Sequence, residues 1–240
     1  GVTTEDLINV AAGSYQVTIS DQNGCSYTSN TFTINEPPSL VVVATLSDNN
    51  GYGVSCNGSN DGSVSVAVSG GTTPYTYLWN DENNSTSSSV GSLVAGTYLV
   101  TVTDGNGCTF TNSYVLTEPA LFVETSQTLV DVLCNGFLSG SIDIELGGGV
   151  LPFTYNWSNG ASTQDLTGIG AGTYLVTASD GNGCTFGGSY TINEPASFAD
   201  NASQVDVSCN GVGDGSITLA PNGGTAPYTY LWNGGATTNM

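Results

Sequence analysis

The chain contains no lysine, no arginine and no histidine, whereas 20 of its 240 residues are aspartate or glutamate. Ion pairs between side chains are therefore excluded, and stability has to come from apolar burial, backbone hydrogen bonds and disulfides. Catalytic triads and general bases that use histidine or lysine are excluded too, as are isopeptide bonds between lysine and asparagine. No feature of the sequence favours a catalytic site, and we expect a protein that is not an enzyme.

The acidic residues give a formal net charge of −20 at pH 7. Such a surface repels nucleic-acid phosphates and anionic lipid headgroups, so we expect no nucleic-acid partner and no direct membrane insertion. The chain also has no run of 18 apolar residues and does not open with a basic segment. Its first residues resemble the second half of a domain, so we expect any secretion signal or membrane anchor to lie outside this chain.

Glycine is abundant, with 33 residues, and hydrophobic residues make up 38% of the chain, including 12 tyrosines and 3 tryptophans. This composition is typical of short strands separated by many turns. The apolar content is high enough for packed cores, which argues against disorder.

Two sequence blocks recur three times, and each repeat closes on a Glu-Pro pair. The first block spans 62–79, 140–157 and 215–232, and the second spans 12–25, 95–108 and 171–184. The sequence therefore predicts the C-terminal part of a repeat at residues 1–36, complete repeats at 37–118 and 119–195, and the N-terminal part of another at 196–240.

Apolar residues alternate with polar ones within each block, as Tyr75, Tyr77 and Trp79 do. This period of two predicts antiparallel strands with one buried face, and the Asn-Gly pairs predict tight hairpins. About seven short strands in 80 residues, with a tryptophan on the third, indicate an immunoglobulin-like sandwich. We predict an all-β protein made of tandem immunoglobulin-like β-sandwich repeats arranged as an extended rod. The segment from Cys25 to Pro37 is one residue longer than its equivalents, which predicts a β-bulge.

The recurrent aromatic residues are expected in the cores of the repeats. The predicted core residues are Trp79, Trp157, Trp232, Tyr15, Tyr98 and Tyr174. The Gly-Ser-Tyr or Gly-Thr-Tyr that opens each second block also resembles a tyrosine corner, in which the phenol bonds the backbone across a turn. Both interpretations of these tyrosines stay open.

The motifs resemble the SprB repeat, which occurs many times in very large surface proteins of gliding Bacteroidota. Cys56-Asn57-Gly58, Asp61-Gly62, Gly-Gly-Thr-Thr-Pro-Tyr-Thr-Tyr-Leu-Trp79, Ala95-Gly-Thr-Tyr and Asp104-Gly-Asn-Gly-Cys108 carry this resemblance. The Asp-Gly pair is lost after Cys134 but is kept at Asp214. The resemblance implies export by type IX secretion and a place in mobile or fibrous adhesins, with the repeats as spacers and the binding tips elsewhere.

Six cysteines in an apparently extracellular chain suggest disulfides, although six allow fifteen pairings. A bridge within one repeat, such as Cys56 with Cys108, would have to connect opposite poles of a sandwich. These poles are about 23 Å apart, against a Cα–Cα limit of about 7 Å. We favour a bond between successive repeats, Cys56 with Cys184.

In this scheme the other four cysteines pair with partners outside the chain. A second scheme pairs Cys25–Cys56, Cys108–Cys134 and Cys184–Cys209, as expected if the first strand of a repeat folds back on the last strand of the preceding one. Pairing within repeats, including Cys134 with Cys184, remains open if the strand order differs from the one inferred.

Metal and sugar sites have weaker support. The chain has no Cys-x-x-Cys and no histidine, so a zinc site is not expected. Asp61, Asp81 and Asp104 lie in Asn- and Asp-rich clusters whose oxygen atoms could bind calcium. We expect no cofactor, because turns use the same residues. Surface aromatic residues could bind carbohydrate, but the tryptophans share their strand face with other aromatic side chains, which favours the core.

We interpret the chain as spacer repeats of a large bacterial cell-surface adhesin or filament that supports adhesion or gliding motility. The expected partners are other repeats of the same chain, with self-assembly or glycan contacts through other regions. Two alternatives are repeats that each bind calcium or carbohydrate, and a subunit of a self-assembling extracellular filament.

Overall fold

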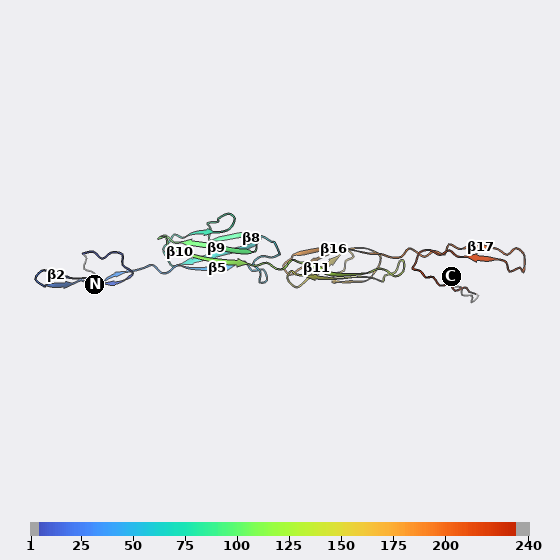
Figure 1. Ribbon diagram of the computed structural model, residues 1–240, viewed down its shortest axis with the longest axis horizontal. Helices are drawn as coiled ribbons and strands as arrows, with labels where there is room; N and C mark the ends of the chain where they lie inside the picture. Colours follow the sequence, from blue (N-terminus) through green and yellow to red (C-terminus); the bar gives the residue numbers. More distant parts are fainter. Residues whose placement is uncertain (1–4, 234–240) are drawn as a thin grey trace. The chain divides into compact units, whose positions relative to one another are not determined.

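The computed structural model describes residues 5–233, and all of its regular elements in this range are β-strands. This confirms the predicted all-β class, and no helix able to span a membrane occurs among these residues. The chain divides into two compact units. Unit 1 comprises residues 1–47 and 61–116, and unit 2 comprises residues 48–60 and 117–240. Figure 1 shows strands of both units, coloured along the sequence.

Unit 1 contains a sandwich of two three-stranded antiparallel sheets with the strand orders β5-β6-β8 and β10-β9-β7. Its strands are β5 (Val41–Leu46), β6 (Gly62–Ser69), β7 (Thr76–Trp79), β8 (Ser89–Leu93), β9 (Gly96–Thr103) and β10 (Thr109–Leu116). In immunoglobulin terms, strands A, B and E form one sheet, and strands C, F and G form the other. The strand D that such a fold often has is absent from the described part of this repeat.

The core of unit 1 forms because inward-facing residues alternate with outward-facing ones on both sheets. Val64 and Val66 of β6 pack with Val100 and Val102 of β9 in one buried cluster around Trp79. Since this cluster draws on both sheets, the repeat closes its own hydrophobic core.

Unit 2 contains a second sandwich of the same design, with the strand orders β11-β12-β14 and β13-β15-β16. Its strands are β11 (Val123–Val130), β12 (Gly140–Gly147), β13 (Thr154–Trp157), β14 (Leu166–Ile169), β15 (Gly172–Ser179) and β16 (Thr185–Ile192). Its core cluster includes Ile142, Ile144 and Trp157, all of them buried. The same alternation of residues therefore produces the same sandwich twice.

The two incomplete repeats form shorter ladders. The first has the strands β1 (Gly13–Tyr15), β2 (Thr18–Ser20), β3 (Ser26–Thr28) and β4 (Phe32–Ile34), and the last has β17 (Ser203–Val205) and β18 (Ser216–Thr218). Thr18 lies opposite Thr28, whereas Tyr15 lies opposite Phe32. Tyr15 and Thr18 are three positions apart, whereas their partners are four positions apart. The segment that joins β3 to β4 therefore holds one extra residue, which confirms the predicted bulge.

The aromatic residues assigned to the core differ in burial. Trp79 and Trp157 are 1% and 2% exposed, but Trp232 is only half-buried. In the described part of its repeat β17 and β18 form the only sheet, so no second sheet covers this indole.

The recurrent tyrosines combine the two proposed roles. All three are half-buried, and two pack against the core clusters. Each hydroxyl also donates a hydrogen bond to the carbonyl four residues earlier, from Tyr15 to Ala11, from Tyr98 to Val94 and from Tyr174 to Gly170.

A bulge in strand E gives a prediction with an internal control. Ser92 has φ of 57° and its equivalent Gly168 has φ of 65°, a backbone region that costs a non-glycine residue about 1 kcal/mol or more. Ser92→Gly is expected to stabilise unit 1 by up to about 1 kcal/mol in urea denaturation. Gly168→Ser is expected to destabilise unit 2 by a similar amount through backbone strain. No steric clash adds to this cost, because a Cβ there meets nothing closer than 3.9 Å. Equal stability of parent and variants would contradict this strain.

Candidate functional site

The hairpin between β15 and β16 is held by the carboxylate of Asp180. Its Oδ1 accepts hydrogen bonds from the backbone N–H groups of Asn182 (2.9 Å) and Cys184 (2.8 Å), and its Oδ2 accepts one from Val150 N–H (2.8 Å). Gly183 supplies the positive φ of 83° that the turn requires. Asp180 is 6% exposed, so its charge is compensated by backbone donors rather than by a cation.

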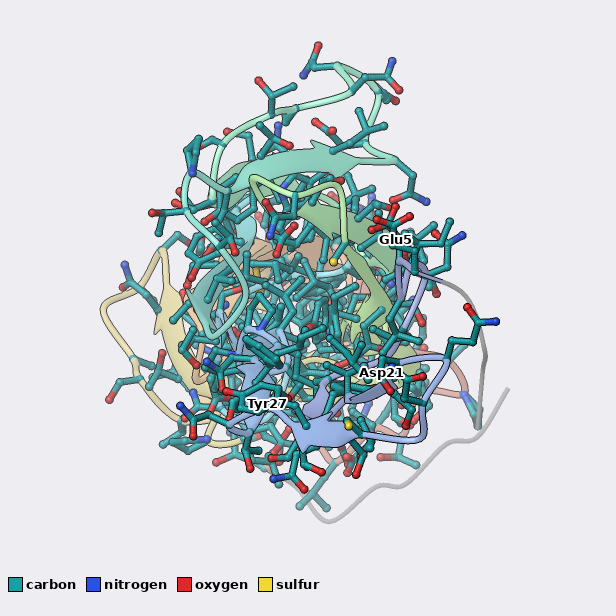
Figure 2. All side chains as sticks on the ribbon, turned by 90° about the vertical axis from the view of Figure 1, so that its left-hand side faces the viewer. Glu5, Asp21 and Tyr27 are labelled. Atoms are coloured by element: carbon teal, nitrogen blue, oxygen red, sulfur yellow. A yellow bond between two sulfur atoms is a disulfide. The ribbon has the colours of Figure 1, made fainter. Side chains whose placement is uncertain are left out.

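The equivalent hairpins have the same construction. Asp104 accepts from the N–H groups of Asn106, Cys108 and Thr72, each at 2.9 Å. Asp21, which is labelled in Figure 2, lies at the turn between β2 and β3 and accepts from the N–H groups two and four residues later. The recurrent aspartate is thus a turn residue that fixes the position of the cysteine after it.

The turn aspartate of unit 1 gives a prediction about acid. The hydrogen bond from Thr72 N–H, followed by those from Cys108 and Asn106, lowers the pKa of Asp104 against the opposing effect of burial. A depressed folded-state pKa stabilises the fold above the unfolded pKa of about 4, and this contribution is lost as the pH falls through the folded pKa. Asp104→Asn is therefore expected to flatten the loss of unit 1 stability below about pH 4, measured by urea denaturation. An unchanged acid profile would contradict this role.

A second recurrent contact pairs the Cys-Asn-Gly motif with the Glu-Pro motif. Asn57 Nδ2 donates to the carbonyl of Pro119 (3.1 Å), and Gly58 N–H donates to the carboxylate of Glu118 (2.6 Å). The same two bonds recur from Asn135 to Pro195 and from Gly136 to Glu194. Both motifs recur in the sequence, but the sequence alone does not show that they contact each other, because about 60 residues separate them.

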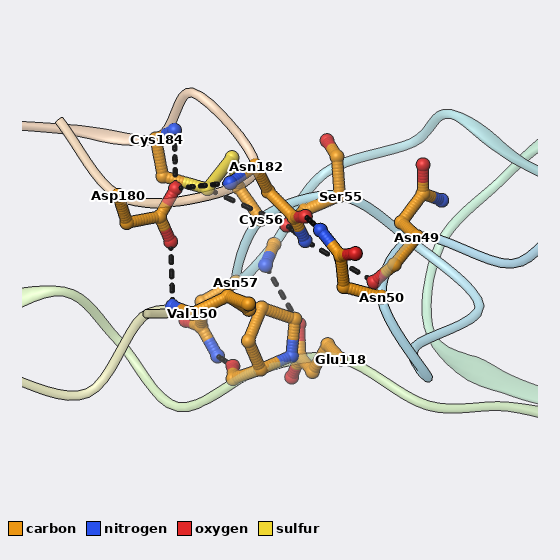
Figure 3. The surroundings of a disulfide bond; sticks show 12 residues. Asn49, Asn50, Ser55, Cys56, Asn57, Glu118, Val150, Asp180, Asn182 and Cys184 are labelled. Carbon is orange, nitrogen blue, oxygen red and sulfur yellow. Dashed lines mark hydrogen bonds between the residues drawn. A yellow bond between two sulfur atoms is a disulfide. The ribbon is translucent and has the colours of Figure 1, made fainter. Parts of the chain in front are cut away.

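A disulfide joins a Cys-Asn-Gly segment to an Asp-x-Asn-Gly-Cys hairpin in unit 2. Cys56 lies in the loop between β5 and β6, and Cys184 lies immediately before β16, the last strand of the following repeat. The Cα atoms are 5.7 Å apart, within the range that a disulfide allows. Figure 3 shows the bond between the loop and the hairpin. This is the pair favoured on sequence grounds, and in the structure neither Cys56–Cys108 nor Cys25–Cys56 is joined.

The side chain of Asn182 makes three polar contacts with the loop beside the disulfide. Its Nδ2 donates to the carbonyls of Ser55 (2.8 Å) and Asn49 (3.2 Å), and its Oδ1 accepts from Asn50 Nδ2 at 2.5 Å (Figure 3). The Asn-Gly pair was expected only to form a turn. Its asparagine side chain also holds the loop, which a turn motif alone does not reveal.

The remaining candidates stay apart from this site. Cys25, Cys108, Cys134 and Cys209 are exposed thiols in the structure. Asp81 accepts from Ser85 N–H and Oγ, both at 2.7 Å, and Asp61 is exposed before β6. Within residues 5–233, no three Asp, Glu, Cys or His side chains are grouped as a metal site would need. Calcium binding is the alternative to the expected turn role of these residues, and melting with and without EDTA would test it.

The SprB repeat model matches the chain three times, at residues 54–84, 126–162 and 201–237. Each match contains a Cys-Asn-Gly motif and the tryptophan of the aromatic strand. The family resemblance inferred from these motifs is thereby confirmed. A search of curated proteins finds none that matches.

Among solved structures, the chain is similar to the N-terminal eight Ig domains of Down syndrome cell adhesion molecule, with 12% identity and a TM-score of 0.41, covering 76% of this chain and 28% of that one. It is also similar to a tetra-tandem repeat in the extending region of a large adhesion protein, with 16% identity and a TM-score of 0.26, covering 91% and 72%. The amphioxus IgVJ-C2 molecule has 15% identity and a TM-score of 0.26, covering 62% and 96%. The immunoglobulin-like assignment rests on the sheet topology rather than on these likenesses.

Proposed function

We propose that this chain of SprB repeats is a structural spacer in a large extracellular adhesin, with the binding regions elsewhere in the protein. One observation carries the proposal: an element of one repeat is covalently bonded to an element of the next, as Cys56 is to Cys184. Such a link suits a spacer, because it connects successive repeats in addition to the single backbone connection. Export by type IX secretion and a part in gliding motility belong to the same proposal.

The chemistry of the chain suits an extracellular spacer. Disulfides persist in oxidising compartments outside the cytosol. A net charge of −20 without any cationic side chain keeps neighbouring chains apart. Because each complete repeat closes its own core, an array can lengthen by one sandwich per repeat without rearrangement of the others.

Small-angle X-ray scattering of the purified chain tests the spacer role. A compact domain of 240 residues has a radius of gyration of about 18 Å. The proposal predicts a monomer with a value well above this, and one that does not change when calcium or oligosaccharides are added. A compact particle near 18 Å, or defined oligomers, would contradict it.

We extend the observed pairing to the exposed cysteines. Cys134 and Cys209 belong to the same loop motif as Cys56, and Cys25 and Cys108 belong to the same hairpin motif as Cys184. In a glutathione redox buffer, crosslinks between copies should join a loop cysteine to a hairpin cysteine. Loop-to-loop or hairpin-to-hairpin links in equal yield would show that the motifs do not select each other.

A further inference from the structure

The position of the disulfide in the sequence determines how a pulling force passes through the chain. Cys56 and Cys184 are separated by 128 positions, so 127 residues, Asn57 to Gly183, lie between them. When the two ends of the chain are pulled, tension runs along the backbone to Cys56, crosses the sulfur–sulfur bond and continues from Cys184. The enclosed 127 residues are bypassed and carry no tension.

The bypassed segment contains most of both complete sandwiches. It runs from β6 through β15 and includes Trp79 and Trp157 at the centres of the two cores. Of the strands of the two complete sandwiches, only β5 of the first and β16 of the second lie on the loaded path. Both occupy sheet edges and are already extended, so detaching them releases little length.

The structure also holds the two ends of the crosslink in place. On the loop side, Asn57 and Gly58 are bonded to Pro119 and Glu118. On the hairpin side, Asp180 holds the N–H of Cys184, and Asn182 bonds three residues of the loop. Without the covalent bond, tension at this point would fall on non-covalent contacts alone, these hydrogen bonds and the backbone bond from Val54 N–H to the carbonyl of Thr117 among them.

We infer that the Cys56–Cys184 disulfide is a mechanical bypass, which carries tension past the two cores and prevents extension of residues 57–183. This inference rests on the proposed spacer function, and it assigns the disulfide a role beyond stability. If the exposed cysteines pair in the same way in a longer array, each bond would protect the cores between its two ends. The partner chemistry is then a Cys-Asn-Gly loop and an Asp-x-Asn-Gly-Cys hairpin of another SprB repeat.

Single-molecule pulling of the whole chain through peptide tags at its two ends tests the bypass. A fully extended chain spans about 3.3 to 3.6 Å per residue, so the enclosed 127 residues hold about 440 Å of hidden length. The oxidised chain is expected to release none of it. The same chain, folded first and then treated with a phosphine reductant, is expected to gain about 440 Å of contour length when it unfolds.

Two variants serve as matched controls. Cys56→Ser should behave like the reduced parent, and Cys134→Ser, which removes an exposed cysteine from the equivalent loop, should behave like the oxidised parent. Because the parent is folded before reduction, the comparison does not depend on how well Cys56→Ser folds. Release of the full length from the oxidised chain, or no gain on reduction, would overturn the bypass.

The outcomes also separate this inference from the proposed function. An elongated monomer in scattering that shows no hidden length on reduction would leave the spacer in place without a bypass. A compact particle would remove the spacer, whatever the pulling curves show.

Discussion

Loss of the Cys56–Cys184 disulfide is expected to lower the free energy of unfolding of unit 2 by about 2–4 kcal/mol. The bond closes a loop of 128 positions, and a crosslink over so long a loop removes much conformational entropy from the unfolded chain. Cys56→Ser in urea denaturation should show this loss, as should the parent in a phosphine reductant. The cysteines line a cavity of about 310 Å³, through which a small reductant can approach.

The effect should be localised as well as large. Hydrogen exchange is expected to rise first at residues 48–60 and at the hairpin around Asn182, where non-covalent contacts such as the hydrogen bonds of Asn182 must hold the loop once the disulfide is lost. Cys134→Ser is the control, because that thiol is exposed and unbonded in the structure. Equal losses of stability in the two variants would show that the disulfide contributes no more than an unpaired cysteine.

Truncation of the central tryptophan is expected to have the largest effect on a single sandwich. Trp157 is 2% exposed, its ring centroid lies 5.7 Å from that of Tyr190, and its Nε1 donates to the carbonyl of Thr163 at 2.9 Å. Trp157→Ala removes this buried volume and leaves the carbonyl without its donor. We expect a loss of about 3–5 kcal/mol in unit 2, measured by urea denaturation.

The other sandwich provides a matched test. Trp79 is equally buried and donates from Nε1 to the carbonyl of Ser87 at 2.9 Å. Trp79→Ala should weaken unit 1 by a similar amount, and hydrogen exchange should place each loss in the sandwich that holds the altered residue. A loss below about 1 kcal/mol in either variant would mean that the indole is not central to its core.

The strands and the cores could be predicted from the sequence because their signal is local. The alternation of Val64 and Val66 with their neighbours has a period of two, and it can be recognised within a few consecutive residues of a single sequence. The missing strand D was not predicted, because residues 80–88 and 158–165 are turn-rich segments whose lengths do not reveal whether they pair. The half-burial of Trp232 depends on which strands cover it, and alternation within its own strand gives no information on that point.

Long-range contacts were harder to predict. The disulfide follows from a spatial argument about the poles of the sandwich, since sequence spacing alone suggests pairs within repeats. The bonds from Asn57 and Gly58 to Pro119 and Glu118 were not anticipated, although both motifs recur in every complete repeat. Repeat boundaries drawn at Glu-Pro pairs also differ from the compact units, because residues 48–60 belong by sequence to one repeat and by contacts to unit 2.

Peptide mapping of the unreduced protein tests the central claim most directly. Trypsin has no site in a chain without lysine and arginine, so pepsin or chymotrypsin is required. A loop that binds the hairpin of the following repeat predicts a crosslinked pair of peptides containing Cys56 and Cys184. Recovery of Cys56 joined to Cys108 would place the bond within one repeat and contradict the account.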